Sequence, residues 1–461
     1  MNRLLLIFFL LTSFYSQAQI ITLFAGNGGG FGGDGGPATA AGLPDPGGGI
    51  FDRYGNYYFV DLGAKRIRKI DASGIITTVA GNGFGGSTGD GSPATAARLN
   101  APSAVKLDTS GNLLIADGGN NNIRKVDIIS GIISTIAGTG TAAYGGDNGP
   151  AAAASLNDPQ DIAIDKWNNI YIGDVFNFRV RKINSSGFIT TFAGTGTEGF
   201  TGDGGQATVA EISGVTGMSV DTAGNLYIAD QFIGQRVRKI DITGIITTVA
   251  GNGGYIYGGD GMPATDAQIN PIKVALDSVS NIYISDKYNL RIFKVDGSGI
   301  IHCVAGNGVL GFSGDGGPAT AAEFNYPSGV ALDACGNLYI AETGTLSTPD
   351  SANIRKVTFN PTCDPYSDHF DSASLAIKTI INNEVHIYPN PVYSEITIKV
   401  NNKIDQITIT NLIGQTVYSQ ACDLEKAEVN IAGLPEGVYI VKVKDNEGNV
   451  TTNKIIKENV K

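Results

Sequence analysis

An acidic and aromatic segment recurs six times between residues 26 and 325. Each copy contains Gly-Asp-(Gly/Asn)-x-(Pro/Gln)-Ala, and in five copies an aromatic residue stands three positions before the aspartate. Carboxylates beside aromatic rings in glycine-rich loops are typical of surfaces that bind saccharides, peptides or calcium. The candidate ligand-binding residues are Phe31, Asp34, Tyr144, Asp147, Phe200, Asp203, Tyr257, Asp260, Phe312 and Asp315.

A structural role for the same segment is the alternative. Each aspartate would then bond to the backbone of its own loop, while the aromatic residue packs on an apolar residue nine positions after the aspartate. Because the segment recurs in every copy, this interpretation is favoured over a ring of ligand sites. A calcium loop needs several closely spaced oxygens, and each copy offers one carboxylate. We therefore expect no metal or cofactor, with calcium as the alternative.

The spacing of these segments reveals an internal repeat. An Ala-Gly dipeptide closes each copy after 55 to 57 residues, a period typical of propellers and solenoids. Within each period the pattern predicts a strand ending in Asp, a tight turn ending in Asn, and three further alternating strands. Four antiparallel strands repeated six times predict an all-β, six-bladed β-propeller over residues 19–357.

The two ends of the repeated region indicate how the ring closes. The sixth copy has three strands and no fourth, whereas Ile20–Phe24 reads as a fourth strand with no first three before it. We expect this N-terminal strand to complete the sixth blade, because closure removes free strand edges.

One pair of strands carries a family resemblance. Gly224–Asp230 reads Gly-Asn-Leu-Tyr-Ile-Ala-Asp and is followed by Arg-Val-Arg-Lys-Ile at Arg236–Ile240, and variants recur in all six copies. These repeats resemble the NHL family over roughly residues 20–357. The sixth copy departs from the pattern, with Glu342 in place of Asp and a longer loop after it. The resemblance implies a propeller used mostly for recognition of a protein, peptide or glycan, with a minority of enzymes.

Differences between the copies mark where catalysis could arise. Side chains five and four residues before the first-strand aspartate should face the channel, and charged residues occur there only at Asp161 and Lys273. This pair could support general acid–base chemistry in a hydrolase or lyase at the channel mouth. Propeller lactonases and lyases that use calcium place several carboxylates, Asn or His at these positions. A binding module is therefore favoured, and an enzyme is the alternative.

The charge balance limits the partners. There are 43 acidic and 32 basic residues, and the net charge of −11 argues against nucleic acid as a partner. Arginines recur in the predicted third strands, but each follows an acidic residue of the second strand, so we expect local ion pairs rather than a basic stripe. These arginines are Arg68, Arg124, Arg181, Arg238 and Arg355.

The cysteines point to a disulfide rather than to a metal site. Four cysteines without CxxC spacing and three histidines do not make a zinc cluster. Cys335 lies in a turn of the sixth blade, and Cys363 follows the third strand of that blade at the same end. A disulfide between them is geometrically reasonable, although spacing alone does not determine the pairing.

The first 18 residues are typical of a secretory signal peptide. Arg3 precedes the apolar run Leu4–Leu11, and Ser16-Gln17-Ala18 is a small-x-small cleavage pattern. No later run is long enough for a transmembrane helix. We expect an exported chain with no transmembrane helix after signal removal, in a compartment where disulfides form.

The C-terminal residues form a separate module. Residues 358–384 read as an irregular linker, and residues 385–461 alternate in seven or so short segments that predict a small Ig-like β-sandwich. Tyr388–Pro391, Asn411–Gln415 and Gly433–Tyr439 resemble the C-terminal sorting domain of the type IX (Por) secretion pathway. The resemblance implies contact with the type IX machinery and delivery to the outer surface or medium of a Gram-negative bacterium. A generic Ig-like adhesive domain is the alternative.

Overall fold

The chain divides into two compact units, Met1–Phe370 and Asp371–Lys461. The predicted signal peptide and most of the predicted linker lie outside the described residues. The computed structural model describes residues 19–344, 352–361, 363, 386–388, 394–411, 416–435, 437–446 and 450–457.

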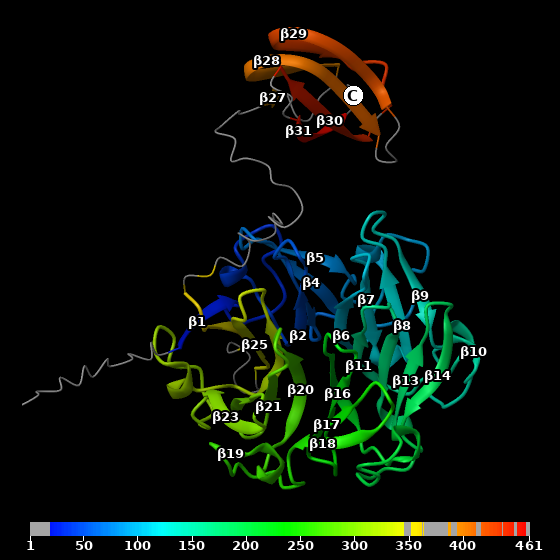
Figure 1. The fold of residues 1–461 in the computed structure, drawn as a ribbon, viewed down its shortest axis with the longest axis vertical. Helices are drawn as coiled ribbons and strands as arrows, with labels where there is room; N and C mark the ends of the chain where they lie inside the picture. Colours follow the sequence, from blue (N-terminus) through cyan, green and yellow to red (C-terminus); the bar gives the residue numbers. More distant parts are fainter. Residues whose placement is uncertain are drawn as a thin grey trace, which may run out of the picture. The chain divides into compact units, whose positions relative to one another are not determined.

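Six antiparallel sheets follow one another around a ring in the first unit (Figure 1). In five of these blades, four consecutive strands pair in chain order from the inside of the ring to the outside. The first three blades contain β2 (Pro46–Phe51), β3 (Tyr57–Asp61), β4 (Arg66–Ile70) and β5 (Ile76–Ala80); β6 (Pro102–Leu107), β7 (Leu113–Asp117), β8 (Asn122–Val126) and β9 (Ile133–Ala137); and β11 (Pro159–Ile164), β12 (Ile170–Asp174), β13 (Arg179–Ile183) and β14 (Phe188–Ala193). The next two contain β15 (Val215–Val220), β16 (Leu226–Asp230), β17 (Arg236–Ile240) and β18 (Ile246–Ala250); and β20 (Pro271–Leu276), β21 (Ile282–Asp286), β22 (Arg291–Val295) and β23 (Ile300–Ala305).

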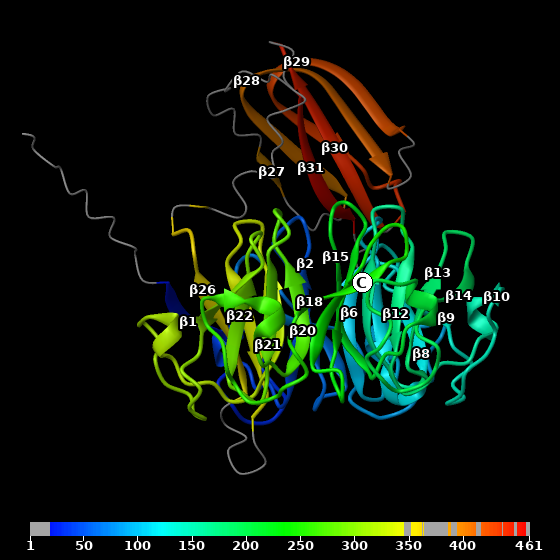
Figure 2. The same ribbon diagram turned by 60° about the horizontal axis from the view of Figure 1, so that its bottom comes forward.

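The sixth blade is completed by the N-terminal strand. Its chain-order strands are β24 (Pro327–Leu332), β25 (Leu338–Glu342) and β26 (Asn353–Thr358). Strand β1 (Ile20–Ala25) pairs antiparallel with β26 on the outer edge of this sheet. Figure 2 shows the blue β1 beside the yellow β26. This is the pairing that closure of the ring by the N-terminus requires.

Short elements fill the loops between and within the blades. Two-residue strands extend the outer edges of the third and fifth blades, and 3₁₀ helices occur in the connecting loops. These elements are β10 (Gly149–Pro150), β19 (Met262–Pro263), η1 (Ala38–Ala40), η2 (Ala94–Ala96), η3 (Gly118–Asn120), η4 (Ala151–Ala153), η5 (Val175–Asn177), η6 (Ala207–Val209), η7 (Ala264–Asp266) and η8 (Ala319–Ala321).

The turn between the first and second strands forms through its own side chains. In the first blade, Asp52 Oδ1 accepts hydrogen bonds from the backbone N–H groups of Tyr54 and Asn56, at 2.8 and 2.9 Å. The Asn56 amide donates to Asp52 Oδ2 at 2.7 Å. Gly55 supplies the positive φ of 81° that the turn needs. The predicted Asp-to-Asn turn therefore rests on contacts within five residues.

Apolar layers between neighbouring sheets form the core of the propeller. The five residues of β12 are all buried, because each blade packs between two others and both of its faces are covered. One layer joins Tyr57, Phe59 and Ile70 of the first blade to Tyr339 and Ile354 of the sixth. Such layers fix the order of the blades around the ring.

The loop that precedes each blade folds back along its outer strands. Before the first blade, Gly35 N–H donates to the carbonyl of Ile76, and Ile76 N–H donates to the carbonyl of Gly36. Gly33 has φ of 86°, and a Cβ there would lie 2.7 Å from the Cα of Ala41. Only glycine fits this close approach, which explains part of the recurring glycine.

The second unit contains a single curled sheet in its described residues (Figure 2). Residues Glu395–Asn411 form one long strand, with a register shift between Lys399 and Ile404. One bent sheet thus encloses its own core around Ile398, Ile407 and Val441, in place of the two sheets and seven or so strands expected of a sandwich. Its strands are β27 (His386–Tyr388), β28 (Glu395–Asn411), β29 (Thr416–Asn430), β30 (Gly437–Asp445) and β31 (Val450–Lys457).

The prediction of an all-β chain with a six-bladed propeller is confirmed. Among the described residues, no helix is long and apolar enough to cross a membrane.

Candidate ligand face and channel

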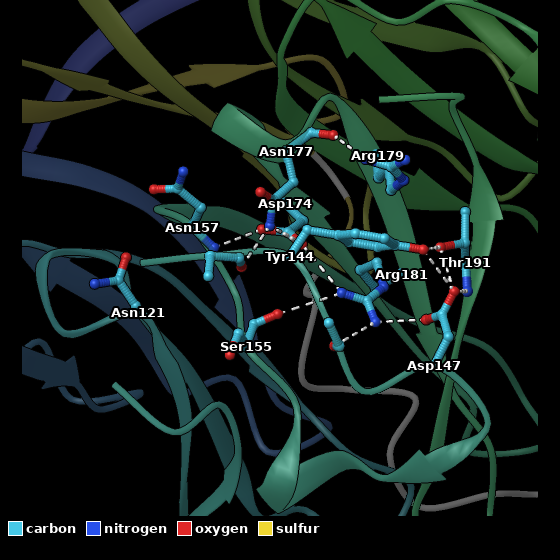
Figure 3. Close-up of polar contacts among 12 residues, drawn as sticks. Asn121, Tyr144, Asp147, Ser155, Asn157, Asp174, Asn177, Arg179, Arg181 and Thr191 are labelled. Carbon is cyan, nitrogen blue, oxygen red and sulfur yellow. Dashed lines mark hydrogen bonds and ion pairs between the residues drawn. The ribbon is translucent and has the colours of Figure 1, made fainter. Parts of the chain in front are cut away.

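The aspartates of the recurring loops hold buried arginines, and the third blade shows the arrangement (Figure 3). Arg181 on β13 has a fully buried side chain, and its Nη2 donates to Asp147 Oδ1 in the loop before the blade. Its Nη1 lies 3.3 Å from Oδ2 of Asp174, the buried residue that ends β12. Asp147 Oδ2 also accepts hydrogen bonds from the backbone N–H and the hydroxyl of Thr191, at 3.1 and 2.7 Å. The guanidinium therefore lies between one carboxylate at the surface and one in the interior.

Four other blades repeat this ion pair. The closest N–O distances are 2.6 to 2.9 Å, and every arginine side chain is fully buried. Each arginine also lies 3.3 to 3.7 Å from the acidic residue that ends the second strand, which confirms the local ion pairs predicted for these arginines. The expected partner of the aspartates was their own loop backbone, and the structure gives them an arginine instead. The pairs are Asp34–Arg68, Asp90–Arg124, Asp203–Arg238 and Asp315–Arg355.

The loop carboxylates lie over the outer half of each blade. Asp34 contacts Arg68 on β4 and Thr78 on β5, the third and fourth strands. The first strands of neighbouring blades contact one another and line the channel. The loop aspartates therefore do not converge on the channel mouth.

The two carboxylates that flank Arg181 differ in their ionisation. Burial opposes ionisation of Asp147, but hydrogen bonds from Thr191 and the charge of Arg181 outweigh it and hold its pKa below the usual range. Burial raises the pKa of Asp174 to about 6, although Asn177 and Arg181 oppose the increase. The loop aspartate is therefore the firmly charged partner of the arginine.

The fifth blade departs from this pattern because Phe293 replaces the arginine. Asp260 consequently has no guanidinium partner among the described residues, and it accepts a hydrogen bond from Cys303 N–H at 2.9 Å. Tyr257 stacks on Phe293, with 5.7 Å between ring centroids and 10° between planes. Apolar stacking thus takes the place of the ion pair in this blade.

The loop aromatics stack on arginines at the start of the third strands. The Arg179 guanidinium lies 3.8 Å from the ring centroid of Tyr144, and Arg66 lies 3.8 Å from that of Phe31. A Cβ at Gly83 would lie 2.6 Å from Arg66 Nη1, so glycine backbone covers the other face of this guanidinium. Arginine is thus layered between a glycine and an aromatic ring, which holds the ring in one orientation.

In four of the six blades the loop aromatic lies against this arginine. Arg236 lies over Phe200 at 4.3 Å and Arg291 over Tyr257 at 4.0 Å. In the second blade Asn122 replaces the arginine and Ser87 replaces the aromatic residue. Comparing the copies position by position would have revealed this pairing from the sequence. In the sixth blade Phe312 lies over the deeper Arg355 at 5.4 Å instead.

The two catalytic candidates meet inside the channel. Lys273 Nζ on β20 lies 3.3 Å from Asp161 Oδ2 on β11. Asp161 is 2% exposed and also accepts backbone N–H groups from Ile162 and Met218, at 2.8 and 2.9 Å. Burial lowers the pKa of Lys273, and the charge of Asp161 opposes this decrease. The hollow beside the pair measures about 10 Å³, enough for about one water molecule.

A third charged residue of the channel was missed by sequence reasoning. Lys106 on β6 has its Nζ 3.9 Å from Asp161 Oδ1. It stands two residues before the first-strand aspartate and two after the inspected position Ala104, on the same side of the strand as Ala104. The signal was available, because the other copies have uncharged residues there. These are Ile50, Ala163, Ser219, Ala275 and Ala331.

Larger hollows occur on the face of the ring that carries the Asp52–Asn56 turn and its counterparts, here called the turn face. One of about 530 Å³ lies between the first two blades, beside Tyr54 and Ile129. Another of about 170 Å³ lies at the channel mouth on this face and is lined by Lys106 and Ser219. The opposite face, which carries the recurring aromatic loops, is here called the loop face.

The predicted disulfide partners and the calcium alternative can also be placed. Cys335 and Cys363 are joined by a disulfide, with Cα atoms 5.9 Å apart, and Cys303 and Cys422 are free. Within the described residues, no three His, Cys, Asp or Glu side chains gather to hold a metal ion.

The fold and the repeats define the class of protein. Six antiparallel blades, whose repeats resemble those of the NHL family, form a β-propeller, and a separate sheet domain follows it in the chain. Residues 386–458 match the family described as secretion system C-terminal sorting domain. The chain is therefore a propeller protein with a secretion sorting tail.

Two curated relatives match part of the chain. It is 29% identical over 263 residues to Protein SUPPRESSOR OF QUENCHING 1, chloroplastic, of Arabidopsis thaliana, and 31% identical over 243 residues to teneurin-1 of Gallus gallus. These matches span 54% and 46% of this chain, but only 24% and 9% of the two relatives. The relatives are much longer proteins, of which this chain resembles one part.

Two solved bacterial structures share the fold. A protein of unknown function from Bacteroides thetaiotaomicron has a TM-score of 0.53 at 20% identity, over 74% of this chain and 76% of that chain. An auxiliary nutrient binding protein from Bacteroides ovatus has a TM-score of 0.54 at 16% identity, over 74% and 77%. At these identities the likeness concerns the fold alone.

Proposed function

We propose that this protein is an exported binding module whose loop face binds an extracellular glycan. The proposal rests on the loop aromatics, whose rings lie against arginine on one side and are exposed to solvent on the other. Phe31, Tyr144, Phe200 and Phe312 are 41 to 46% exposed. Rigid rings that need little ordering are effective platforms for a ligand, because less side-chain entropy is lost on binding.

The distribution of these rings favours an extended ligand over a small one. They stand in different blades around the ring, and their neighbouring carboxylates are already engaged with arginines. A polymer of repeated units can contact several such platforms at once, and weak contacts then add up through multivalency. The name of the Bacteroides ovatus neighbour agrees with a binding role, although that likeness is confined to the fold.

Catalysis at the channel is the alternative, and the geometry favours binding. Asp161 is shared between Lys273 and Lys106, and the adjacent hollow holds about one water molecule. A hydrolase or lyase would need an acid or base that can reach substrate, and this carboxylate is already enclosed by its partners.

A glycan and peptide array of the full chain tests the proposed ligand class. The Tyr144→Ala, Phe200→Ala double variant should lose about tenfold or more in affinity for the glycans that bind. Trp167→Ala is the matched control, because Trp167 is an aromatic residue 56% exposed on the turn face. Binding to peptides alone, or equal loss in the control, would contradict the proposal.

The sorting domain supports delivery through the type IX machinery to the outer surface or medium. Deleting residues 386–458 should leave the propeller in the periplasm of the expressing Gram-negative host. Fractionation followed by immunoblotting measures this, and a propeller still found outside the cell would contradict the assignment. Because this readout needs no ligand, it is independent of the array.

A further inference from the structure

Two lysines share one carboxylate in the channel, which leaves a positive charge there without a full partner. Asp161 lies 3.3 Å from Lys273 Nζ and 3.9 Å from Lys106 Nζ. Lys273 has a second acceptor, the carbonyl of Gln160 at 2.9 Å. Lys106 Nζ makes no hydrogen bond to any of the described residues, and its side chain is only 23% exposed. An ammonium held in such a place attracts an anion.

The hollow beside Lys106 combines this charge with apolar walls. It measures about 170 Å³ and opens on the turn face at the mouth of the channel. A hydroxyl and a charged group among apolar side chains is the usual composition of a small-molecule site. The lining includes Lys106, Ser219, Ile50, Ile164, Met218 and Val220.

The geometry points to a binding site for a short aliphatic monocarboxylate at the turn-face mouth of the channel. The carboxylate pairs with Lys106 and accepts from the Ser219 hydroxyl, while the chain packs on Ile50, Ile164 and Val220. The hollow is large enough to admit a short aliphatic chain, and butyrate is the probe chosen. The site is on the turn face, opposite the loop face proposed to bind a glycan. The carboxylate site and the glycan-binding function are therefore tested independently.

Calorimetric titration of the full chain with butyrate tests this site. We expect one butyrate site per chain. Butyramide has the same shape without the charge, so its affinity should be lower than that of butyrate by about tenfold or more. Lys106→Met keeps the aliphatic stem and should weaken butyrate binding by about tenfold or more. Lys69→Met, on the third strand of the first blade and away from the hollow, is the matched control and should bind as the parent does.

A second variant separates this hollow from the lysine itself. Ile164→Trp should fill the space and abolish butyrate binding while Lys106 remains, and thermal unfolding shows whether the variant is folded. The proposal is wrong if the parent binds no butyrate at about 10 mM. It is also wrong if butyramide or the Lys106→Met variant binds equally well, or if folded Ile164→Trp still binds butyrate.

Discussion

Lys273 Nζ lies 3.3 Å from Asp161 Oδ2, and this contact joins the first strand of the fifth blade to that of the third. The lysine also donates to the Gln160 carbonyl, a residue 113 positions earlier in the chain. The two residues that the sequence suggested as an acid and a base, Asp161 and Lys273, thus form an ion pair between non-adjacent blades. Burial makes each charge depend on the other.

Substitutions of Asp161 and Lys273 should show strong energetic coupling between the two side chains. Asp161→Asn leaves two lysines without a counter-charge and should lower the free energy of unfolding by about 3 kcal/mol. Adding Lys273→Met should restore part of the loss, with a coupling energy of about 1–3 kcal/mol in a double-mutant cycle. Urea unfolding measures all four proteins. Additive effects of the two substitutions would show that the contact carries no energy.

The buried arginines should be essential to the stability of their blades. Arg238→Met leaves buried Asp230 without its guanidinium and should lower the free energy of unfolding by about 3–5 kcal/mol. The neighbouring Lys239→Met is the control, because that ammonium lies at the sheet surface over Tyr227, and its loss should change stability by about 0.5 kcal/mol. Similar losses in both variants would contradict the structural role of the arginine.

Glu342 should make stability fall as pH rises. Burial raises its pKa to about 8, against the opposing charge of Arg355, whereas the unfolded chain has its usual value near 4.5. Between about pH 4.5 and 8 the folded state therefore holds a proton that the unfolded state releases, so unfolding is favoured as pH increases.

The isosteric variant isolates this contribution. Glu342→Gln cannot ionise, so its stability relative to the parent should rise from pH 5 to pH 8, by up to about 1.4 kcal/mol per pH unit. Unfolding by urea at several pH values gives this difference. A difference that is constant with pH would show that Glu342 ionises normally in the folded state.

The disulfide should stabilise the closing blade. Cys335 and Cys363 enclose a segment of 28 residues, and constraint of the unfolded chain predicts a contribution of about 3–4 kcal/mol. The Cys335→Ser, Cys363→Ser variant should therefore unfold at lower urea concentration, and a reductant should do the same to the parent. Cys303→Ser is the control for thiol removal. An unchanged midpoint after reduction would contradict this prediction.

The loop face shows how far local patterns reach. The recurrence of Asp147 and Tyr144 in the loops was visible, and so was the alternation of Arg181 on its strand. That Asp147 meets Arg181, 34 residues later, was not visible, because the loop folds back along the outside of the blade.

In the channel, differences between the copies identified two charged residues from the sequence and missed a third. Asp161 and Lys273 were found because they break the repeat, but Lys106 was overlooked two positions further along its strand. Its importance depends on the meeting of three first strands, which no single copy of the repeat encodes.

The amino-acid sequence by itself determined the number of blades, their strand order, the Asp52–Asn56 turn and the sorting tail. These features depend on a period and on contacts within a few residues, which a linear pattern records. Only the tertiary structure decided which carboxylate meets which cation, and where hollows remain. Those outcomes depend on how residues tens to more than a hundred positions apart pack in the closed ring, and a repeated sequence gives every blade nearly the same local instructions.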